Sequence, residues 1–496
     1  MRRLLLALLC AAALAGCSGR YFRDAVGAAP EVRYALAGWP QPEQWAGVIF
    51  NGEKIGFTRL TLRPAPAAPG RFEIDSEAVI TMRFLGVEKS IVLRALDRVR
   101  EDLTLERFEY EYVMDGTAMR LRGEFEGGLL AVSAVTGGRP FEQEFRLDRP
   151  LYPSSAMALM PAFRGLLVGA EYVYTVYDGE NQKLGEVTQK VEGWETSELF
   201  QGPAFKLSTL LHGLSTTTWM DSQARPVFEL ALNGVLISVL EDEASARRYL
   251  AAASLNKEEA LVEFSRIRPD RPLERPREVS ALQVEIRGLP QGTALASGAG
   301  QSCAQDDNAT RCEIRRPRSD PPSVTGSRQE AGPTALRPSL NVQSNDPTIR
   351  ALAARITATE ASDLGRVRAL VDWIQANIRR EAVDVFSALD VLQSRRAECQ
   401  GHAWLYAALA RSVGIPTRVV SGLVYLEEFQ GFLYHAWNES LVDGAWLPVD
   451  PTFGQVPADA THITMLEGDT LADLLPMVNW VGRLKISVGE AQYPQK

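Results

Sequence analysis

The chain has 496 residues, of which 46% are hydrophobic and 23% charged, and its formal net charge is −9. A chain of this length exceeds what one hydrophobic core usually organises, so two or three domains are expected. The acidic balance argues against a general nucleic-acid-binding protein, because such proteins present basic surfaces to phosphates. No nucleic-acid partner is therefore predicted.

The first 17 residues have the pattern of a secretory signal. Arg2 and Arg3 precede an apolar run, residues 4–13, that is too short to span a membrane. The run ends in Leu-Ala-Gly-Cys, which resembles a bacterial lipobox and implies cleavage before Cys17 and lipidation of its thiol. Ser18 resembles the sorting signal of outer-membrane lipoproteins. The expected location is the bacterial cell envelope, with Cys17 anchored in the outer membrane and the chain facing the periplasm. The alternative is a plain signal peptide in which Cys17 has no role.

Residues 18–44 show little periodicity and are expected to form a tether, and residues 45–256 to form a β-rich domain. Over 47–240, apolar and polar residues alternate, and a short helix is expected at 241–256. Turn dipeptides interrupt the alternation at Asp115-Gly116, Gly137-Gly138, Asp178-Gly179 and Asn233-Gly234. This pattern predicts an antiparallel meander, either a large curved sheet or an open barrel. Such a sheet could bind a lipid, a peptide or an envelope protein, and the sequence does not distinguish these partners.

Residues 257–345 are predicted to be a linker with short strands. The segment 268–277 is rich in proline and charge, and residues 280–289 contain a strand pattern. Cys303 and Cys312 lie close together in the sequence. In an oxidising compartment they are expected to form a disulfide that closes a small loop, and the alternative is a pair of free thiols.

Residues 346–496 are predicted to be an α+β domain. Asp346-Pro347 is typical of a helix N-cap followed by proline at the first helical position. Further helices are expected at about 364–374, at 388–392 and from Cys399 to Gly414. Residues 431–442 and 445–450 are rich in aromatic and β-branched residues, and Asp443-Gly444 between them predicts a hairpin. The tail adds a turn of helix and a last strand.

Three side chains of this domain have the chemistry of a thiol-dependent site. Cys399 lies in the first turn of its helix, where unpaired N–H groups and the helix dipole favour the thiolate. The hairpin register places His435 opposite Thr452, with Asp450 diagonal to His435 on the same face, roughly 7–8 Å away at the backbone. A thiol, an imidazole base and a carboxylate that orients it are what nucleophilic acyl chemistry requires. Arg395 and Arg396 should also favour the thiolate, and Glu398 should oppose it.

The last third of the chain resembles the catalytic core of the transglutaminase-like superfamily, which shares the papain-like arrangement. The matching motifs are Cys399 at a helix start, His435-Ala436-Trp437-Asn438-Glu439, Asp450-Pro451-Thr452 after Trp446, and Asp459-Ala460-Thr461-His462-Ile463. The residue before the cysteine is Glu398, whereas the superfamily often has aspartate there. The resemblance implies Cys399 as nucleophile, His435 as base and Asp450 as its orienting carboxylate. It also implies a transglutaminase-like α+β domain. With the antiparallel β-rich domain that the alternation predicts ahead of it, the whole chain is expected to be of the α+β class.

Other residues near these three are expected to line the substrate cleft. Trp437 shares a strand face with His435. His402 is expected to be a packing or rim residue, and His462 to line the outer edge of the cleft. His402 is a rival base one helical turn from Cys399, but it has no evident carboxylate to orient it. A zinc site built from Cys399, His402, His435 and His462 is an alternative, but Cys-x-x-His spacing within a helix is weak evidence. No metal site or cofactor is predicted. The Cys399 N–H is expected to be one oxyanion donor.

The sequence therefore predicts a secreted, lipid-anchored cysteine enzyme that cleaves amide bonds through a thioester. The expected substrates are envelope proteins or peptidoglycan, and the activity is that of a peptidase or amidase. Hydrolysis is favoured only by analogy with bacterial relatives, and release by an amine would instead give a cross-linking transglutaminase. A further alternative is a non-catalytic envelope binding or assembly protein with a vestigial thiol site.

Overall fold

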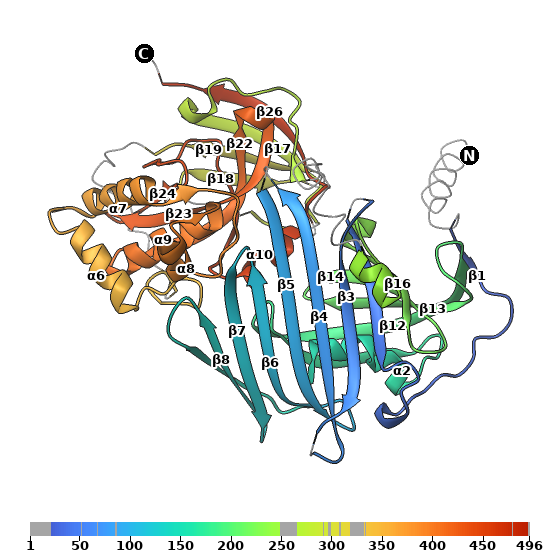
Figure 1. The fold of residues 1–496 in the computed structure, drawn as a ribbon. Coiled ribbons are helices and arrows are strands. Elements are labelled where there is room, and N and C mark those ends of the chain that lie inside the picture. Colours follow the sequence, from blue (N-terminus) through green and yellow to red (C-terminus); the bar gives the residue numbers. More distant parts are fainter. Residues whose placement is uncertain are drawn as a thin grey trace, which may run out of the picture.

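A computed structural model describes the protein (Figure 1). It describes residues 21–494 except 51, 67, 85–86, 249–264, 291, 296–298, 307–308, 318–331, 333 and 479. The signal-like segment with Cys17 lies outside these residues, as does the second half, 249–256, of the helix expected at 241–256. A large curved sheet forms the N-terminal part, and helices and smaller sheets form the C-terminal part. The α+β fold class predicted from the sequence is confirmed.

The N-terminal part is one sheet of 16 strands, antiparallel except where β10 pairs with β11. Its strands are β1 (Phe22–Asp24), β2 (Glu43–Phe50), β3 (Glu53–Pro64), β4 (Arg71–Phe84), β5 (Val87–Arg100), β6 (Leu105–Met114), β7 (Thr117–Glu126), β8 (Leu129–Thr136), β9 (Phe141–Arg146), β10 (Leu151–Pro153), β11 (Glu171–Asp178), β12 (Lys183–Ser197), β13 (Ala204–Leu211), β14 (Leu214–Met220), β15 (Pro226–Ala231) and β16 (Leu236–Glu241). Two short helices, α2 (Met160–Arg164) and α3 (Glu243–Arg248), accompany the sheet.

Alternation along each strand explains how this sheet builds a core. In β8, Leu130, Val132, Ala134 and Thr136 are buried, whereas Ala131 and Val135 between them are exposed. The sheet is continuous because β16 pairs with β2, and its two edges are β9 and β10. It curves until β6 and β11 face each other, and the rings of Phe108 and Tyr177 stack with centroids 4.9 Å apart. The predicted meander is confirmed in its curved form.

The segment before β2 is not the tether that the sequence analysis expected. Phe22 in β1 pairs with Ser197 of β12, and its ring stacks on Trp219 with centroids 4.1 Å apart. Val32 and Leu36 are buried in the same cluster as α2. Val32 and Leu36 lie outside the strands and α-helices, so no period of apolar residues in the sequence marks them as core.

Residues 281–315 also belong to a folded unit. Three strands, β17 (Ala281–Arg287), β18 (Gln301–Gln305) and β19 (Thr310–Arg315), form a sheet with the last strand, β26 (Lys485–Gln492). The structure joins Cys303 and Cys312, which are partners across β18 and β19, in a disulfide with an S–S distance of 2.00 Å. This part of the expected linker therefore packs with the end of the chain.

The C-terminal part places helices against a sheet of order β24-β23-β22-β25. Its helices are α6 (Pro347–Ile356), α7 (Asp363–Asn377), α8 (Ala388–Ser394), α9 (Cys399–Ser412) and α10 (Leu471–Val478). Its strands are β22 (Thr417–Leu426), β23 (Gly431–Val442), β24 (Ala445–Val449) and β25 (Ile463–Glu467), and β20 (Arg379–Arg380) pairs with β21 (Arg396–Ala397). The predicted N-cap is confirmed, because Asp346 Oδ1 accepts the Thr348 N–H at 2.8 Å.

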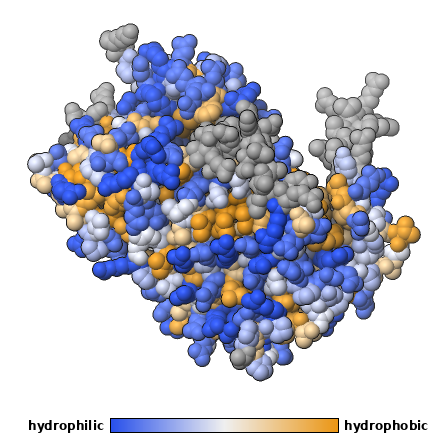
Figure 2. All heavy atoms as spheres, in the orientation of Figure 1, coloured by the Kyte–Doolittle hydropathy of each residue, from blue (hydrophilic) through white to orange (hydrophobic). Residues whose placement is uncertain are grey.

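The two parts share a packed interface. Leu340 and Phe386 of the C-terminal part lie in the same buried apolar cluster as Tyr112 of β6 and Met119 of β7. In the orientation of Figure 1, hydrophilic side chains cover much of the surface and apolar patches gather toward the middle of this face (Figure 2). Among the described residues, every helix is too short or too polar to span a bilayer.

Candidate active site

Cys399 is the first residue of α9, as the sequence predicted. At this position the backbone N–H has no partner within the helix and is free to meet a ligand. The side chain is partly exposed and lines a cavity of about 430 Å³ together with His435. The Ala436 N–H donates to the sulfur, so the thiol lies beside the strand that carries the histidine. Cys399 and His435 are therefore brought to one cavity from two elements.

The helix is held on β23 by polar contacts that repeat along its length. The Asn438 side-chain amide donates to the Ala403 carbonyl at 3.1 Å, and the Tyr406 hydroxyl bonds the Ser440 hydroxyl at 2.8 Å. These groups are buried, where a lost partner costs about 1–3 kcal/mol. They fix the orientation of the thiol relative to the histidine.

His435 and Asp450 come together through the predicted hairpin. The register runs from Val442 opposite Ala445 to Asn438 opposite Val449, and the turn residues Asp443 and Gly444 both have positive φ. The ladder ends at Val449, so the pairing expected between His435 and Thr452 does not form.

The carboxylate nevertheless reaches the histidine. Asp450 Oδ2 accepts the His435 Nε2–H at 2.9 Å, while Oδ1 accepts the Thr452 and Phe453 N–H groups at 2.7 and 3.1 Å. Because Nε2 is used in this way, Nδ1 is the ring nitrogen of His435 that remains to exchange a proton with the thiol.

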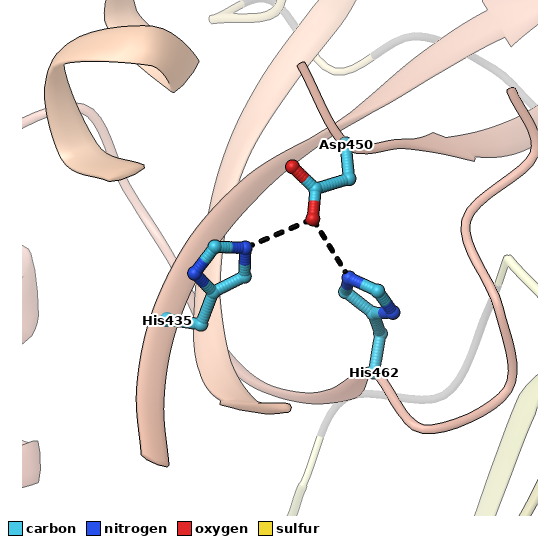
Figure 3. A group of neighbouring side chains, drawn as sticks. All are labelled: His435, Asp450 and His462. Atoms are coloured by element: carbon cyan, nitrogen blue, oxygen red, sulfur yellow. Dashed lines mark hydrogen bonds and ion pairs between the residues drawn. The ribbon is translucent and has the colours of Figure 1, made fainter. Parts of the chain in front are cut away.

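A second imidazole meets the same carboxylate oxygen. His462 Nε2 lies 3.0 Å from Asp450 Oδ2, and both histidines point toward that atom (Figure 3). The other nitrogen of His462 is 3.0 Å from the Asp459 carbonyl and 3.4 Å from its carboxylate. The sequence analysis placed His462 at the cleft rim, which is wrong, because the side chain is buried behind the cavity. The Asp-Ala-Thr-His-Ile motif held the signal, since it contains both Asp459 and His462.

The electrostatics of these groups differ sharply. Burial alone would raise the pKa of Asp450, but the charges and hydrogen bonds of His435 and His462 hold it well below its usual range. Burial would lower the pKa of His462, yet Asp459 and Asp450 raise it to about 9. Burial lowers the pKa of His435 and outweighs the attraction of Asp450. At neutral pH the site therefore holds a neutral His435 and a charged His462 around one carboxylate.

The sequence analysis expected a thiol that ionises easily, and this expectation is wrong. Burial raises the pKa of Cys399 to about 12, and the negative charges of Glu398 and Asp450 act in the same direction. Backbone N–H groups of Ala436 and Gln400 lower it by less. Arg396, expected to help, is instead paired with Glu381 at 3.0 Å. The resting pair is thus a neutral thiol and a neutral imidazole.

Trp437 and His402 do not line the cavity, in contrast to the sequence analysis. Trp437 is fully buried, and its ring lies parallel to that of His435 with centroids 6.0 Å apart. It shares the predicted strand face but lies behind the histidine. His402 is buried, and its Nδ1 bonds the Glu398 carbonyl at 2.8 Å. The cavity wall is instead largely apolar, and its members include Val424, Leu426, Leu433, Leu474, Met477 and Val481.

His435, Asp450 and His462 also have the donor types of a metal site. Their donor atoms lie within 4.8 Å of one another, and all three side chains are buried. The zinc alternative considered from the sequence used Cys399 and His402, which are not in this group. The same three atoms already make hydrogen bonds of ordinary length, so the group is complete without an ion.

Replacing His462 by glutamine should raise the pKa of His435 by about one unit, because a nearby positive charge is removed. The glutamine amide can still donate to Asp450. The chain has four histidines, so imidazole NMR resolves His435, and His212→Gln, remote and paired with Asp178, is the matched control. An unchanged pKa of His435 would contradict the described charge on His462.

His462 should also make stability depend on pH. Because its pKa rises from 6.5 to about 9 on folding, His462 contributes its full stabilisation of the folded protein below pH 6.5. This contribution should be lost as pH rises to about 9.

Comparison with known proteins agrees with this geometry. Residues 350–451 match the model of the transglutaminase-like superfamily. Kyphoscoliosis peptidase of Mus musculus is 32% identical over 113 residues, which are 20% of this chain and 17% of that protein. The Homo sapiens protein of the same name is 31% identical over 106 residues, which are 19% of this chain and 16% of that protein. The chain thus spans less than one fifth of the length of these relatives.

A solved structure also shows similarity. It is a proposed cysteine protease from Cytophaga hutchinsonii, 18% identical, with a TM-score of 0.27, and the match covers 44% of this chain and 86% of that one. The matched family region begins within α6 and ends just after Asp450, so it contains Cys399, His435 and Asp450. By this family match, residues 350–451 are a transglutaminase-like domain within the longer chain.

Proposed function

We propose that this protein is a cysteine acyl-transfer enzyme that hydrolyses amide bonds through a thioester on Cys399. The observation that supports this most directly is one cavity that presents Cys399 and His435, with Asp450 bonded to the far side of the imidazole. This is the arrangement of nucleophile, base and orienting carboxylate that covalent acyl transfer requires.

The proposed reaction starts from the neutral pair. As the Cys399 sulfur attacks the carbonyl carbon, His435 Nδ1 takes the thiol proton, and Asp450 stabilises the imidazolium that forms. The carbon–nitrogen bond then breaks, and Nδ1–H gives its proton to the leaving amine. Water attacks the thioester while His435 takes one of its protons, which returns to the sulfur as the acid product leaves. Proton transfer accompanies the attack because neither group is ionised beforehand.

Two donors are proposed for the oxyanion. The Cys399 N–H lies at the start of α9, where it has no helical partner. The Gln400 side-chain nitrogen is buried and has no hydrogen-bond partner among the described residues, and Gln400 lines the cavity. The apolar wall favours substrates with a large apolar side chain next to the scissile amide.

The proposed setting is the bacterial cell envelope, with Cys17 lipidated and peptide or peptidoglycan amides as substrates. The signal-like N-terminus supports this setting, and the disulfide between Cys303 and Cys312 agrees with an oxidising compartment.

Acylation of the thiol tests the proposal. Wild type and Cys399→Ala are mixed with p-nitrophenyl acetate, and intact-protein mass spectrometry follows the acetyl thioester. We expect rapid acetylation in wild type, loss of the adduct with time in water, and no adduct in the variant. Peptidyl-aminocoumarin amides with an apolar residue before the amide then report turnover.

The outcomes separate the alternatives. Transfer of the acetyl group to added dansylcadaverine in preference to water would favour a cross-linking transglutaminase. Equal, slow labelling of wild type and Cys399→Ala would overturn the enzyme and support a binding protein with a vestigial thiol. His435→Gln is the matched second variant, since it keeps the thiol but should slow acetylation strongly.

A further inference from the structure

A lysine from the β-rich sheet reaches into the C-terminal part close to the thiol. Lys89 lies near the start of β5, and its side chain is only 6% exposed. Its Nζ is 2.9 Å from Asp384 Oδ2 and 3.2 Å from Asp115 Oδ2. Asp115 belongs to the turn between β6 and β7, whereas Asp384 belongs to the segment before α8. A cation of the sheet is thus paired across the interface.

The sheet also fixes the backbone of Asp384. Asp115 Oδ2 accepts the Asp384 N–H at 2.7 Å, and its Oδ1 accepts the Ser90 N–H at 3.0 Å. The Thr117 hydroxyl donates to the Asp384 carbonyl at 3.4 Å. Asp384 is therefore held by its N–H, its carbonyl and its carboxylate, all from the β-rich sheet.

Asp384 in turn contacts the residue that precedes the nucleophile. Its carboxyl group is hydrogen-bonded to that of Glu398, and the Glu398 N–H donates to the Val383 carbonyl at 3.3 Å. Two carboxyl groups in hydrogen-bond contact hold a proton between them. Glu398 occupies the N-cap position of α9, without a capping hydrogen bond from its side chain, and lines the cavity beside Cys399.

We infer that Lys89 is a positioning residue of the thiol site, which holds Asp384 against Glu398 and so limits the pH range in which Glu398 stays protonated beside Cys399. This inference rests on the proposed function only in requiring a reactive Cys399. It makes the β-rich sheet part of the active site, because the sheet supplies the charge that orders the residue before the nucleophile.

The charges around Glu398 give the inference a measurable consequence. Burial and the neighbouring Asp384 raise the pKa of Glu398 to about 8, Lys89 lowers it, and Asp115 raises it. Arg380 and Glu381 also line the cavity, and the charge of Asp450 acts on the Cys399 sulfur. When Glu398 ionises, its charge raises the pKa of the Cys399 thiol. Thiol labelling should therefore rise with pH, level off near pH 8, and then rise again.

The experiment measures the rate of iodoacetamide labelling of Cys399 from about pH 6 to about pH 10 by peptide mass spectrometry. In wild type, the labelling rate above the plateau should be about 10-fold lower than the rate extrapolated from below it. This factor corresponds to a rise of about one unit in the pKa of the thiol. Glu398→Gln keeps a donor to Asp384 but cannot ionise, so its profile should lack the plateau. Lys89→Met should move the plateau to higher pH by about one unit, because the cation that favours ionised Glu398 is lost. Lys89→Arg should restore the wild-type position.

A matched control separates positioning from simple loss of the interface. Gln393→Ala removes another bond across the same interface, from Nε2 to the Gly137 carbonyl at 2.7 Å, and should leave the plateau in place. A plateau that stays in place in Lys89→Met would overturn the inference, and so would one that persists in Glu398→Gln. If Lys89→Met fails to fold, the Lys89→Arg and Glu398→Gln profiles still decide. Because labelling needs no turnover, a plateau without acetylation by p-nitrophenyl acetate would overturn the proposed function and leave this inference standing.

Discussion

Asp450→Asn should lower kcat/KM for cleavage of a peptide amide by about 10⁴-fold, the scale seen when the orienting carboxylate of a triad becomes an amide. Asparagine carries no charge to stabilise the imidazolium of His435. If its NH₂ group faces His435, it donates to Nε2 and forces the ring proton onto Nδ1, which can then no longer accept the thiol proton. Steady-state kinetics with the aminocoumarin peptides measure the loss.

Stability should change in the same variant, with a definite pH dependence. The pKa of Asp450 is depressed in the folded protein, so its carboxylate stabilises the fold above the unfolded pKa of about 3.9 and less as pH falls below it. The difference in unfolding free energy between wild type and Asp450→Asn should therefore shrink in acid. It should also shrink as pH rises from about 6.5 to about 9, because Asp450 contributes to the raised pKa of His462 in the folded protein.

Asp459→Asn is the matched control for Asp450→Asn. Asp459 contacts His462 and Arg277 but not His435, so the bond between His435 and Asp450 is retained. This variant should keep most of the activity while the pKa of His462 falls from about 9. Equal losses of activity in the two variants would contradict the assignment of Asp450 as the carboxylate that orients the base.

The hairpin shows why part of this site could be predicted from the sequence. The positive φ angles of Asp443 and Gly444 set the register of the hairpin. This register brings the backbone positions of His435 and Asp450 close together. Cys399 was placed in the first turn of a helix, whose other end Gly414 marks with a φ of +83°. Local rules of this kind determine elements and their ends.

The features of the site that the sequence analysis missed depend on contacts between segments far apart in the chain. Burial under several elements and the charge of Glu398 raise the pKa of Cys399, and they outweigh the backbone N–H groups of Ala436 and Gln400 that lower it. His462 reaches Asp450 from a loop that no period marks. Lys89 lies about 300 positions before Cys399, and only the curvature of the sheet brings it to the interface. Charge networks across domains have no sequence spacing from which they could be predicted.

Arg411→Met should lower the free energy of unfolding by about 3–5 kcal/mol, because it removes one partner of a buried ion pair. The side chain of Arg411, in the last turn of α9, is only 2% exposed. Its guanidinium makes two bonds to the Asp469 carboxylate, at 2.6 and 2.8 Å, and donates to the Thr417 and Arg337 carbonyls at 2.8 Å. Methionine fills similar space but leaves all these acceptors unpaired.

Urea unfolding followed by far-ultraviolet circular dichroism measures this loss, since the longer helices lie in the C-terminal part. Arg366→Met is the control, because its pair with Asp363 on α7 is largely exposed and should contribute at most about 1 kcal/mol. Losses of equal size in the two variants would contradict a structural role for the buried pair.

The double variant Arg411→Met/Asp469→Asn tests where the loss of stability in Arg411→Met comes from. Most of the loss in Arg411→Met should come from a carboxylate left without its cation, so removing that charge should recover part of the stability. Trp404 on α9 also donates to the Asp469 carbonyl at 2.8 Å, and this bond is unchanged in both variants. Asp469 lies just before α10, whose Leu474 and Met477 line the cavity, so the same ion pair should keep the apolar wall in place beside Cys399.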